Sequence, residues 1–184
     1  GSLPSLVDNG LAEEAIIVAV NGGAQSFYND WSDDTTYGPS SDFPILSESV
    51  IMEDVIPFVD ANFRTIAGRN GRAIEGFSMG GRGAIKLAFN YPDQFCSAIA
   101  YAGAAYESIP GSAIGNPYIG PHESANQMST ITEVNAANIL ANGLQIRLVD
   151  GINDGAAGQG GGSDALSIQL NELGIPHEFE PSQS

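Results

Sequence analysis

Residues 73–84 read Ala-Ile-Glu-Gly-Phe-Ser-Met-Gly-Gly-Arg-Gly-Ala, and they are the most informative segment of this chain for its fold class. The short run at 73–77 predicts a strand, and residues 80–89 have the character of a helix. Between them, residues 76–80 fit the pattern G-x-S-x-G. Glycines beside Ser78 let a strand and a helix meet across a tight turn, because they carry no side chain. This strand–turn–helix context predicts a nucleophile elbow with Ser78 as the nucleophile.

The same alternation of strands and helices continues along the chain on both sides of this segment. Strands are predicted at residues 15–20, 73–77, 95–101, 144–149 and 177–180, and helices at 47–63, 80–89, 130–142 and 164–173. Such an order predicts the α/β class, a mostly parallel sheet with helices on both faces.

Three of these elements carry more specific expectations. The apolar, β-branched run at 15–20 predicts a strand buried on both faces. Pro57 is expected to bend or break the helix at 47–63. Thr130 or Thr132 is expected to cap the helix at 130–142.

The composition excludes several classes of protein. A length of 184 residues suits one domain, 1–184. The net charge of −16 argues against a nucleic-acid partner and against an anionic membrane surface. No apolar run approaches the roughly 20 residues that span a bilayer. Cys96 is the only cysteine, which excludes an internal disulfide, and its apolar surroundings predict inert packing in a buried strand.

The predicted turn also indicates how Ser78 would act as a nucleophile. It would raise the Ser78 hydroxyl above the carboxyl end of the sheet, where the helix N-terminus favours negative charge. The backbone N–H of Met79 would then face the oxyanion of a substrate. Arg82, early in the helix, is expected to be a surface or packing residue and not a catalyst.

Residues 76–84, followed by Tyr91-Pro92-Asp93-Gln94-Phe95, resemble the esterase D/feruloyl-esterase-like α/β-hydrolases. That group includes carbohydrate esterase family 1, with feruloyl and acetyl xylan esterases, and also S-formylglutathione hydrolases and mycobacterial mycolyltransferases. The segments 16–22, 27–31 and 53–58 are similar to the family as well. The resemblance implies an α/β-hydrolase fold and a serine carboxylic-ester hydrolase that forms an acyl-serine, with no cofactor and no metal. The substrates it implies are acyl or feruloyl esters of plant cell-wall carbohydrate.

A triad acid is expected after a later strand, because the order in this fold is serine, acid, histidine. Asp154, three residues after Gly151, matches the family's G-x-x-D pattern and is the preferred acid. Asp150 is the alternative, and is otherwise a strand-end or turn residue.

The base is harder to assign, because the sequence holds only two histidines. His122 precedes the acid, which is the wrong order, and is expected to be a surface-loop residue. His177 has the right order but begins a strand, whereas a triad base needs a loop that reaches the serine.

The resemblance therefore implies that the catalytic histidine lies outside this sequence. It implies a chain cut at both ends, without the N-terminal strands and the C-terminal segment. Such a polypeptide alone is expected to be a weak esterase or none. A sheet edge exposed in this way could also favour self-association.

An aromatic and acidic loop follows the first predicted strand, at the edge where open α/β sheets bind ligands. Tyr28 and Trp31 are expected to line a substrate pocket, although packing of the loop itself, with Phe27 and Tyr37, explains the aromatic residues equally well. Asp30, Asp33 and Asp34 lack the spacing of an EF-hand, so a solvated acidic loop is expected and not a calcium site.

Other functions stay open on the sequence alone. The same chemistry on a thioester, as in S-formylglutathione hydrolase, or acyl transfer to a sugar would use the same residues. A non-catalytic binding domain or pseudoenzyme would keep the fold without a base. We expect a small-molecule or carbohydrate ester as partner and a secreted protein, with the cytoplasm as the alternative location.

Overall fold

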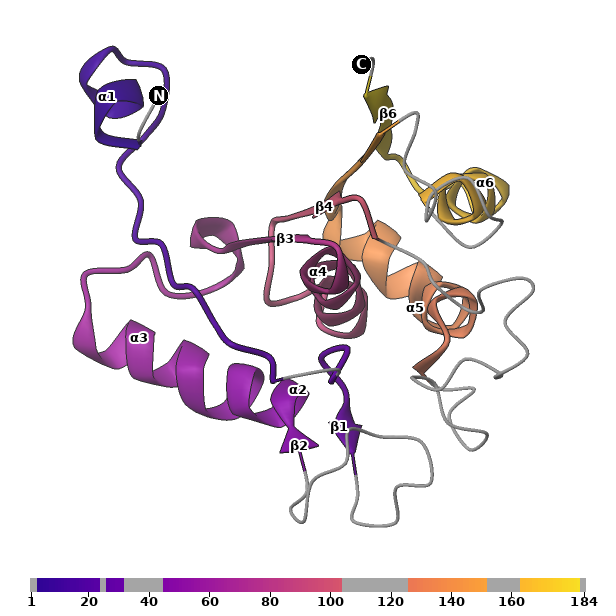
Figure 1. Cartoon of the computed structure of the whole chain (residues 1–184), viewed down its shortest axis with the longest axis horizontal. Coiled ribbons are helices and arrows are strands. Elements are labelled where there is room, and N and C mark those ends of the chain that lie inside the picture. The colour runs from indigo at the N-terminus through magenta and orange to yellow at the C-terminus, as the bar shows by residue number, and fades with distance from the viewer. Residues whose placement is uncertain (1–2, 24–25, 32–44, 104–125, 152–162, 183–184) are drawn as a thin grey trace.

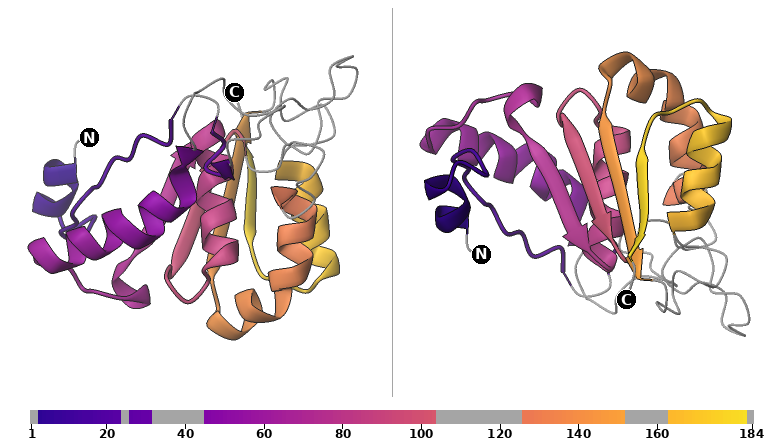
Figure 2. Two further views of the ribbon diagram at one scale, coloured as in Figure 1. Left: turned by 90° about the horizontal axis from the view of Figure 1, so that it is seen from below. Right: turned by 90° about the horizontal axis from the view of Figure 1, so that it is seen from above.

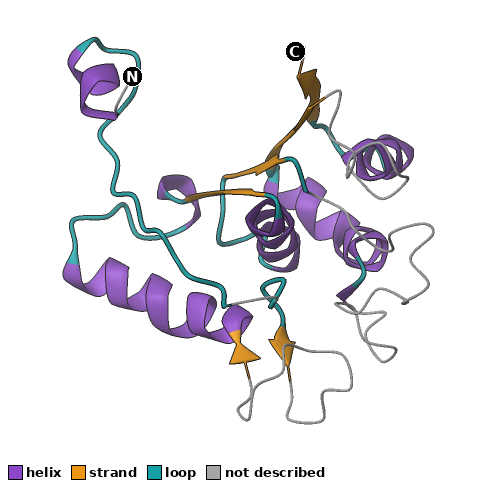
Figure 3. Ribbon diagram, in the orientation of Figure 1, coloured by secondary structure: helices purple, strands orange, loops and turns teal. Residues whose placement is uncertain are grey.

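The computed structural model describes residues 3–23, 26–31, 45–103, 126–151 and 163–182 (Figure 1). Its helices and strands are shown by type in Figure 3. The short N-terminal elements are α1 Leu3–Asp8, β1 Asp30–Trp31, β2 Ile45–Leu46, α2 Ser47–Ser49, the π-helix η1 Val50–Val55, α3 Ile56–Asn62 and the 3-10 helix η2 Arg69–Gly71. The main α/β unit follows as β3 Ala73–Phe77, α4 Met79–Asn90, β4 Ser97–Tyr101, α5 Met128–Asn142, β5 Gln145–Gly151, α6 Ser163–Glu172 and β6 Glu178–Ser182.

The last four of these strands form one parallel sheet. Their spatial order is β3-β4-β5-β6, which is also their order along the chain. The helices α4, α5 and α6 make the connections, and they lie side by side, α4 against α5 and α5 against α6 (Figure 2). The predicted α/β class with a parallel sheet is therefore confirmed. All four strands end at the same edge, so that Phe77, Tyr101 and Gly151 mark its carboxyl end.

Helix α4 lies at the centre of the core. It packs on β3 and β4, and residues 81–89 are all buried. The buried part of the helix includes two cations, Arg82 and Lys86, beside its apolar residues. The apolar residues buried most fully with it are Ile85, Leu87, Ala88, Phe89, Ala98, Ala100, Leu148 and Leu170.

The predicted strand at residues 15–20 is wrong. This segment is extended but joins no described strand, and its apolar side chains are exposed, with Ile17 at 76%. It runs beside η1 and α3, and together they line a groove of about 800 Å³. An apolar, β-branched run becomes a strand only when a neighbouring strand pairs with its backbone N–H and C=O groups.

The predicted helix at 47–63 is confirmed as the continuous series α2, η1 and α3. Pro57 acts on it as expected, because proline has no N–H and crowds the carbonyl four residues before it. The distortion takes the form of a π-helix just ahead of Pro57. There the N–H of Ile56 donates to the carbonyl of Ile51, five residues back.

The predicted caps of the helix at 130–142 are wrong. Helix α5 begins earlier, at Met128, and its N-cap residue is Gln127. The early start places Thr132 inside the helix. Its Oγ1 there donates to the Met128 carbonyl at 2.7 Å, a common way for a buried threonine to satisfy its hydroxyl.

Candidate active site

The turn between β3 and α4 holds Ser78 in an unusual backbone conformation. Its φ of 55° and ψ of −119° lie in a region that non-glycine residues rarely adopt, at a cost of about 1–3 kcal/mol. Two backbone hydrogen bonds hold it there. The Ser78 N–H donates to the Tyr101 carbonyl at 2.8 Å, and the Arg82 N–H donates to the Ser78 carbonyl at 3.1 Å. Ser78 itself is exposed at the carboxyl edge of the sheet.

Glycines make this turn sterically possible. A Cβ on Gly76 would lie 2.2 Å from the Gly80 carbonyl oxygen, well inside contact distance. A Cβ on Gly103, which follows β4, would lie 2.2 Å from the Ser78 carbonyl oxygen. Strand, turn and helix therefore approach so closely that no side chain fits at either position.

The first turn of α4 lies directly after Ser78. The N–H groups of Met79, Gly80 and Gly81 have no carbonyl partner inside the helix, since the first intrahelical acceptor, that of Ser78, serves Arg82. These groups form the positive end of the helix dipole, which favours a negative charge nearby. The role of the Met79 N–H as an oxyanion donor stays a prediction.

Of the two candidate acids, the structure describes only Asp150. Asp154 lies outside the described residues. Asp150 is 4% exposed within β5, and its carboxylate accepts hydrogen bonds from the Ser163 hydroxyl at 2.8 Å and the Ser163 N–H at 3.2 Å. Because Ser163 is the first residue of α6, Asp150 anchors the start of that helix.

Of the two histidines, His122 lies outside the described residues and His177 lies far from Ser78 along the strands. His177 directly precedes β6, and it borders a hollow with Ser97 and Gln145, the first residues of β4 and β5. It is therefore at the amino end of the sheet, opposite Ser78. Its Nε2 is 2.7 Å from the Ser167 hydroxyl and its Nδ1 is 3.1 Å from the Ile175 carbonyl oxygen.

Of the two residues expected to line a substrate pocket, the structure describes the side chain of Tyr28, whereas the side chain of Trp31 lies outside the described residues. The Tyr28 ring packs against α4, since a Cβ on Gly83 would lie 2.3 Å from ring atom Cδ2. Its hydroxyl is 3.7 Å from the position of a Cβ on Gly80, at the first turn of α4. The ring thus packs on the core and also reaches the neighbourhood of the turn.

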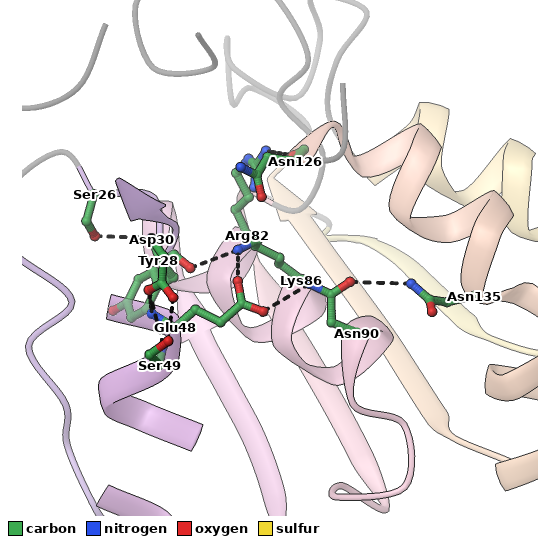
Figure 4. A network of polar contacts seen from close by, with 10 residues as sticks. All are labelled: Ser26, Tyr28, Asp30, Glu48, Ser49, Arg82, Lys86, Asn90, Asn126 and Asn135. Atoms are coloured by element: carbon green, nitrogen blue, oxygen red, sulfur yellow. Dashed lines mark hydrogen bonds and ion pairs between the residues drawn. The ribbon is translucent and has the colours of Figure 1, made fainter. Parts of the chain in front are cut away.

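A buried polar cluster fixes α4 to the segment around Tyr28 and to α2 (Figure 4). Lys86 is fully buried, donates to the Tyr28 carbonyl oxygen at 3.1 Å and forms an ion pair with Glu48. Burial lowers the pKa of Lys86, and the Glu48 carboxylate opposes that shift. Burial and then Glu48 raise the pKa of the nearby Tyr91 phenol to about 12.

Sequence reasoning missed this cluster, although one signal for it exists. Lys86 is the only lysine in the chain and stands within the apolar run Ala84-Ile85-Lys86-Leu87-Ala88-Phe89. A charged residue there must be buried and therefore needs a partner. The partner, Glu48, is too distant in sequence to be identified from the pattern.

Of the two roles expected for Arg82, on the surface or in packing, the structure shows packing. Arg82 is fully buried and donates from Nη2 to the Asn126 carbonyl oxygen at 2.7 Å. The expectation that Cys96 lies within a buried strand needs correction. Cys96 is only partly buried and precedes β4, and its thiol donates to the Arg72 carbonyl oxygen at 3.3 Å. It lies at the margin of the core, because β4 enters the sheet only at Ser97.

The described residues hold no group of three or more His, Cys, Asp or Glu side chains placed to bind a metal ion. Within the same residues, no helix has the length and apolar character needed to cross a membrane.

Comparison with solved structures supports the fold. A ferulic acid esterase superimposes with a TM-score of 0.73 at 23% identity, over 99% of this chain and 67% of that one. An S-formylglutathione hydrolase from Agrobacterium tumefaciens gives a TM-score of 0.58 at 21% identity, over 85% of this chain and 53% of the other. At these identities the likeness shows the α/β-hydrolase fold.

Sequence comparison gives the family. Esterase MT1326 of Mycobacterium tuberculosis (strain CDC 1551 / Oshkosh) is 40% identical over 92 residues, which are 49% of this chain and 18% of that protein. Esterase Rv1288 of strain ATCC 25618 / H37Rv gives the same values. The match thus spans less than a fifth of these relatives. The Esterase family model matches residues 3–166, from α1 into α6 and including the Ser78 turn. The chain therefore belongs to the Esterase family and has the α/β-hydrolase fold that residues 76–95 led us to expect.

Proposed function

We propose that this chain carries the nucleophile of a serine ester hydrolase, and that Ser78 forms an acyl-serine intermediate. The observation that carries the proposal is the Ser78 turn. An exposed serine is held in a strained conformation at the carboxyl edge of a parallel sheet, directly before the N-terminus of α4. Open α/β sheets bind their ligands at this edge, and backbone strain of this kind is concentrated at functional sites.

The proposed reaction proceeds in two steps. The Ser78 Oγ forms a bond to the carbonyl carbon of the ester while a base takes the hydroxyl proton. The negative charge that develops on the carbonyl oxygen is stabilised by the Met79 N–H. The bond to the leaving alcohol then breaks, and that alcohol takes the proton from the base. In the second step the base takes a proton from water as the water oxygen bonds to the acyl carbon. The bond from that carbon to Ser78 Oγ then breaks, Oγ takes the proton back from the base, and the carboxylic acid is released.

We assign Asp154 as the triad acid, the carboxylate that orients the base. Both carboxylate oxygens of the competing Asp150 already accept hydrogen bonds from Ser163, which suits a structural role. His177 is at the wrong end of the sheet, so we do not assign it as the base. With no histidine assigned as the base, the triad lacks one member, and such a loss lowers turnover by about 10⁴–10⁶-fold. We therefore propose that this polypeptide alone hydrolyses esters very slowly.

The preferred substrates are acyl or feruloyl esters of cell-wall carbohydrate, with Tyr28 and Trp31 beside the bound ester. Family membership and the structural likeness to a ferulic acid esterase support this choice. Hydrolysis of a thioester is the second candidate, supported by the likeness to an S-formylglutathione hydrolase.

The experiment is a hydrolysis assay with methyl ferulate, a short aryl acetate and a glutathione thioester, with and without added imidazole. Imidazole can act as an external base, so we expect it to accelerate hydrolysis by the parent chain. Imidazole alone also cleaves aryl acetates and thioesters, so its rate without protein is subtracted from each measurement. Ser78→Ala is expected to abolish the acceleration that remains. Equal hydrolysis by the Ser78→Ala variant, or no hydrolysis above background even with imidazole, would contradict the proposal. The ratio of ferulate to thioester rates decides between the two substrates.

A further inference from the structure

Tyr28 stands in a turn that is strained by itself. Phe27 has a φ of 51° and Tyr28 a φ of 59°, two consecutive left-handed residues with large side chains. Each such residue costs on the order of 1 kcal/mol, so other contacts must hold the turn. The Tyr28 N–H donates to the Ser26 hydroxyl at 3.1 Å, and the Tyr28 carbonyl accepts from the Lys86 ammonium at 3.1 Å.

The conformation of this turn fixes where the phenol ring lies. The ring is held between Gly22 and Gly83, at which a Cβ would come within 2.6 Å and 2.3 Å of ring atoms. Ring atoms Cγ and Cδ2 face Gly83, while the hydroxyl is nearer Gly80. The ring therefore extends along α4 toward its N-terminus, and the hydroxyl lies near Gly80 in the first turn of the helix.

Lys86 is itself held in place by contacts that converge on Glu48 (Figure 4). Glu48 pairs with Lys86, and its Oε1 accepts from the Asn90 side chain at 3.2 Å. Asp30 accepts from the backbone N–H of Glu48 at 2.9 Å and of Ser49 at 3.1 Å, which fixes the start of α2. The ammonium group thus has a single well-defined position from which to bind the Tyr28 carbonyl.

Stability alone does not account for this arrangement. Burying an ion pair has a large desolvation cost, and replacing such a pair by apolar groups is often neutral or stabilising. Because the Lys86–Glu48 pair binds the carbonyl of the strained Tyr28, its role is instead to fix the conformation of the Tyr28 turn.

We propose that Lys86 and Glu48 are positioning residues for the active site, because they hold the Tyr28 turn and thereby keep the Tyr28 phenol at the first turn of α4, where it would form one wall for the bound ester. This inference rests on the proposed function. Neither side chain touches the reacting atoms, so both act through Tyr28.

The test is the double variant Lys86→Met, Glu48→Gln, which removes both buried charges together and leaves neither unpaired. The probe is a fluorophosphonate, and the measurement is its rate of reaction with Ser78 in the presence of imidazole. We expect that rate to fall by about tenfold or more, because small displacements in a site cost this much. The melting temperature is expected to change little.

A second variant displaces the Tyr28 ring by a different change. Gly83→Ala pushes the ring directly and leaves the ion pair intact, and we expect a similar loss of rate. The matched control is Arg72→Met, Asp60→Asn, which removes the partly buried pair joined at 2.6 Å before β3. This control is expected to alter stability without changing the labelling rate beyond about twofold, since it lies at the opposite end of the sheet.

The outcomes separate the two proposals. If the parent chain is labelled at Ser78 and both variants react within about twofold of it, the positioning role is overturned while the proposed function stands. If the control loses as much rate as the variants, the effect is one of general stability, which also overturns the positioning role. If the parent is not labelled at Ser78, the proposed function fails, and the inference fails with it.

Discussion

The two ends of the parallel sheet are built differently. At the carboxyl end, Ser78 is exposed and strained, and Gly76 has no room for a side chain. At the amino end, polar side chains are paired by an ion pair and a hydrogen bond. Arg72 binds Asp60 at 2.6 Å, and His177 lies 2.7 Å from the Ser167 hydroxyl.

This difference shows at which end of the sheet a reactive site can form. Strands of a parallel sheet end at one edge, and the helices that follow them begin there with unpaired N–H groups. The strain at Ser78 is thus at the end where a substrate can meet a helix N-terminus. The one described histidine is at the other end, so reactivity cannot be assigned from residue type alone.

Gly76→Ala, at the carboxyl end, is expected to destabilise the chain more than any other change considered. Its Cβ would lie 2.2 Å from the Gly80 carbonyl oxygen, and both groups belong to the backbone, which can move little. We expect the free energy of unfolding to fall by more than about 3 kcal/mol, measured by urea denaturation. The control is Gly80→Ala, whose nearest neighbour would be 3.7 Å away. A loss as small as that of the control would mean that the turn is looser than described.

Asp150→Asn comes next, also toward the carboxyl end. The amide would place a donor against the N–H or hydroxyl of Ser163, and we expect a loss of about 1–3 kcal/mol in unfolding free energy. Labelling at Ser78 should remain, because we assign the triad acid to Asp154. Asp164→Asn, in the first turn of the same helix but exposed, is the control. Loss of labelling with full stability would move the acid role to Asp150.

His177→Phe tests the amino end. It removes the contact with the Ser167 hydroxyl, which should cost about 0.5–1.5 kcal/mol in unfolding free energy. Ser167→Ala removes the same contact and should have a similar effect, and the double variant should show that the two losses are not additive. The rate of labelling at Ser78 is expected to be unchanged. A large fall in that rate would place His177 in the catalytic machinery.

Tyr91→Phe has an effect that appears only at high pH. Because the phenol pKa is raised from 10.0 to about 12 in the folded chain, the unfolded chain loses this proton first. The stability that Tyr91 contributes is therefore fully present below pH 10 and is lost as pH rises toward about 12. Melting temperatures across this range should fall more steeply for the parent chain than for the Phe variant. Parallel curves would show that the phenol is not shifted.

Much of the α/β unit follows from its sequence. Residues 73–90 combine a short strand, glycines at the required places and an apolar helix, so local pattern and tertiary structure agree. The segment 15–20 has an equally strong strand pattern but no described partner strand. Its failure shows that pairing between strands is not encoded in one strand alone.

The candidate site was predictable to a similar degree. Ser78 and its turn are visible in the sequence because their geometry is local. The pairing of Lys86 with Glu48, and of Asp150 with Ser163, depends on residues 38 and 13 positions apart that only the folded chain brings together. The position of His177 relative to Ser78 likewise depends on the direction of the strands and the order of the sheet.

If Ser78 is the reactive residue of this chain, a reagent specific for activated serines should modify it covalently. The parent chain and its Ser78→Ala variant are treated with a fluorophosphonate, with and without imidazole, and the modified residue is located by peptide mass spectrometry. We expect modification at Ser78, faster with imidazole, and none at that peptide in the variant. Modification at another serine, equal modification of the variant, or an unmodified Ser78 even with imidazole would contradict this expectation.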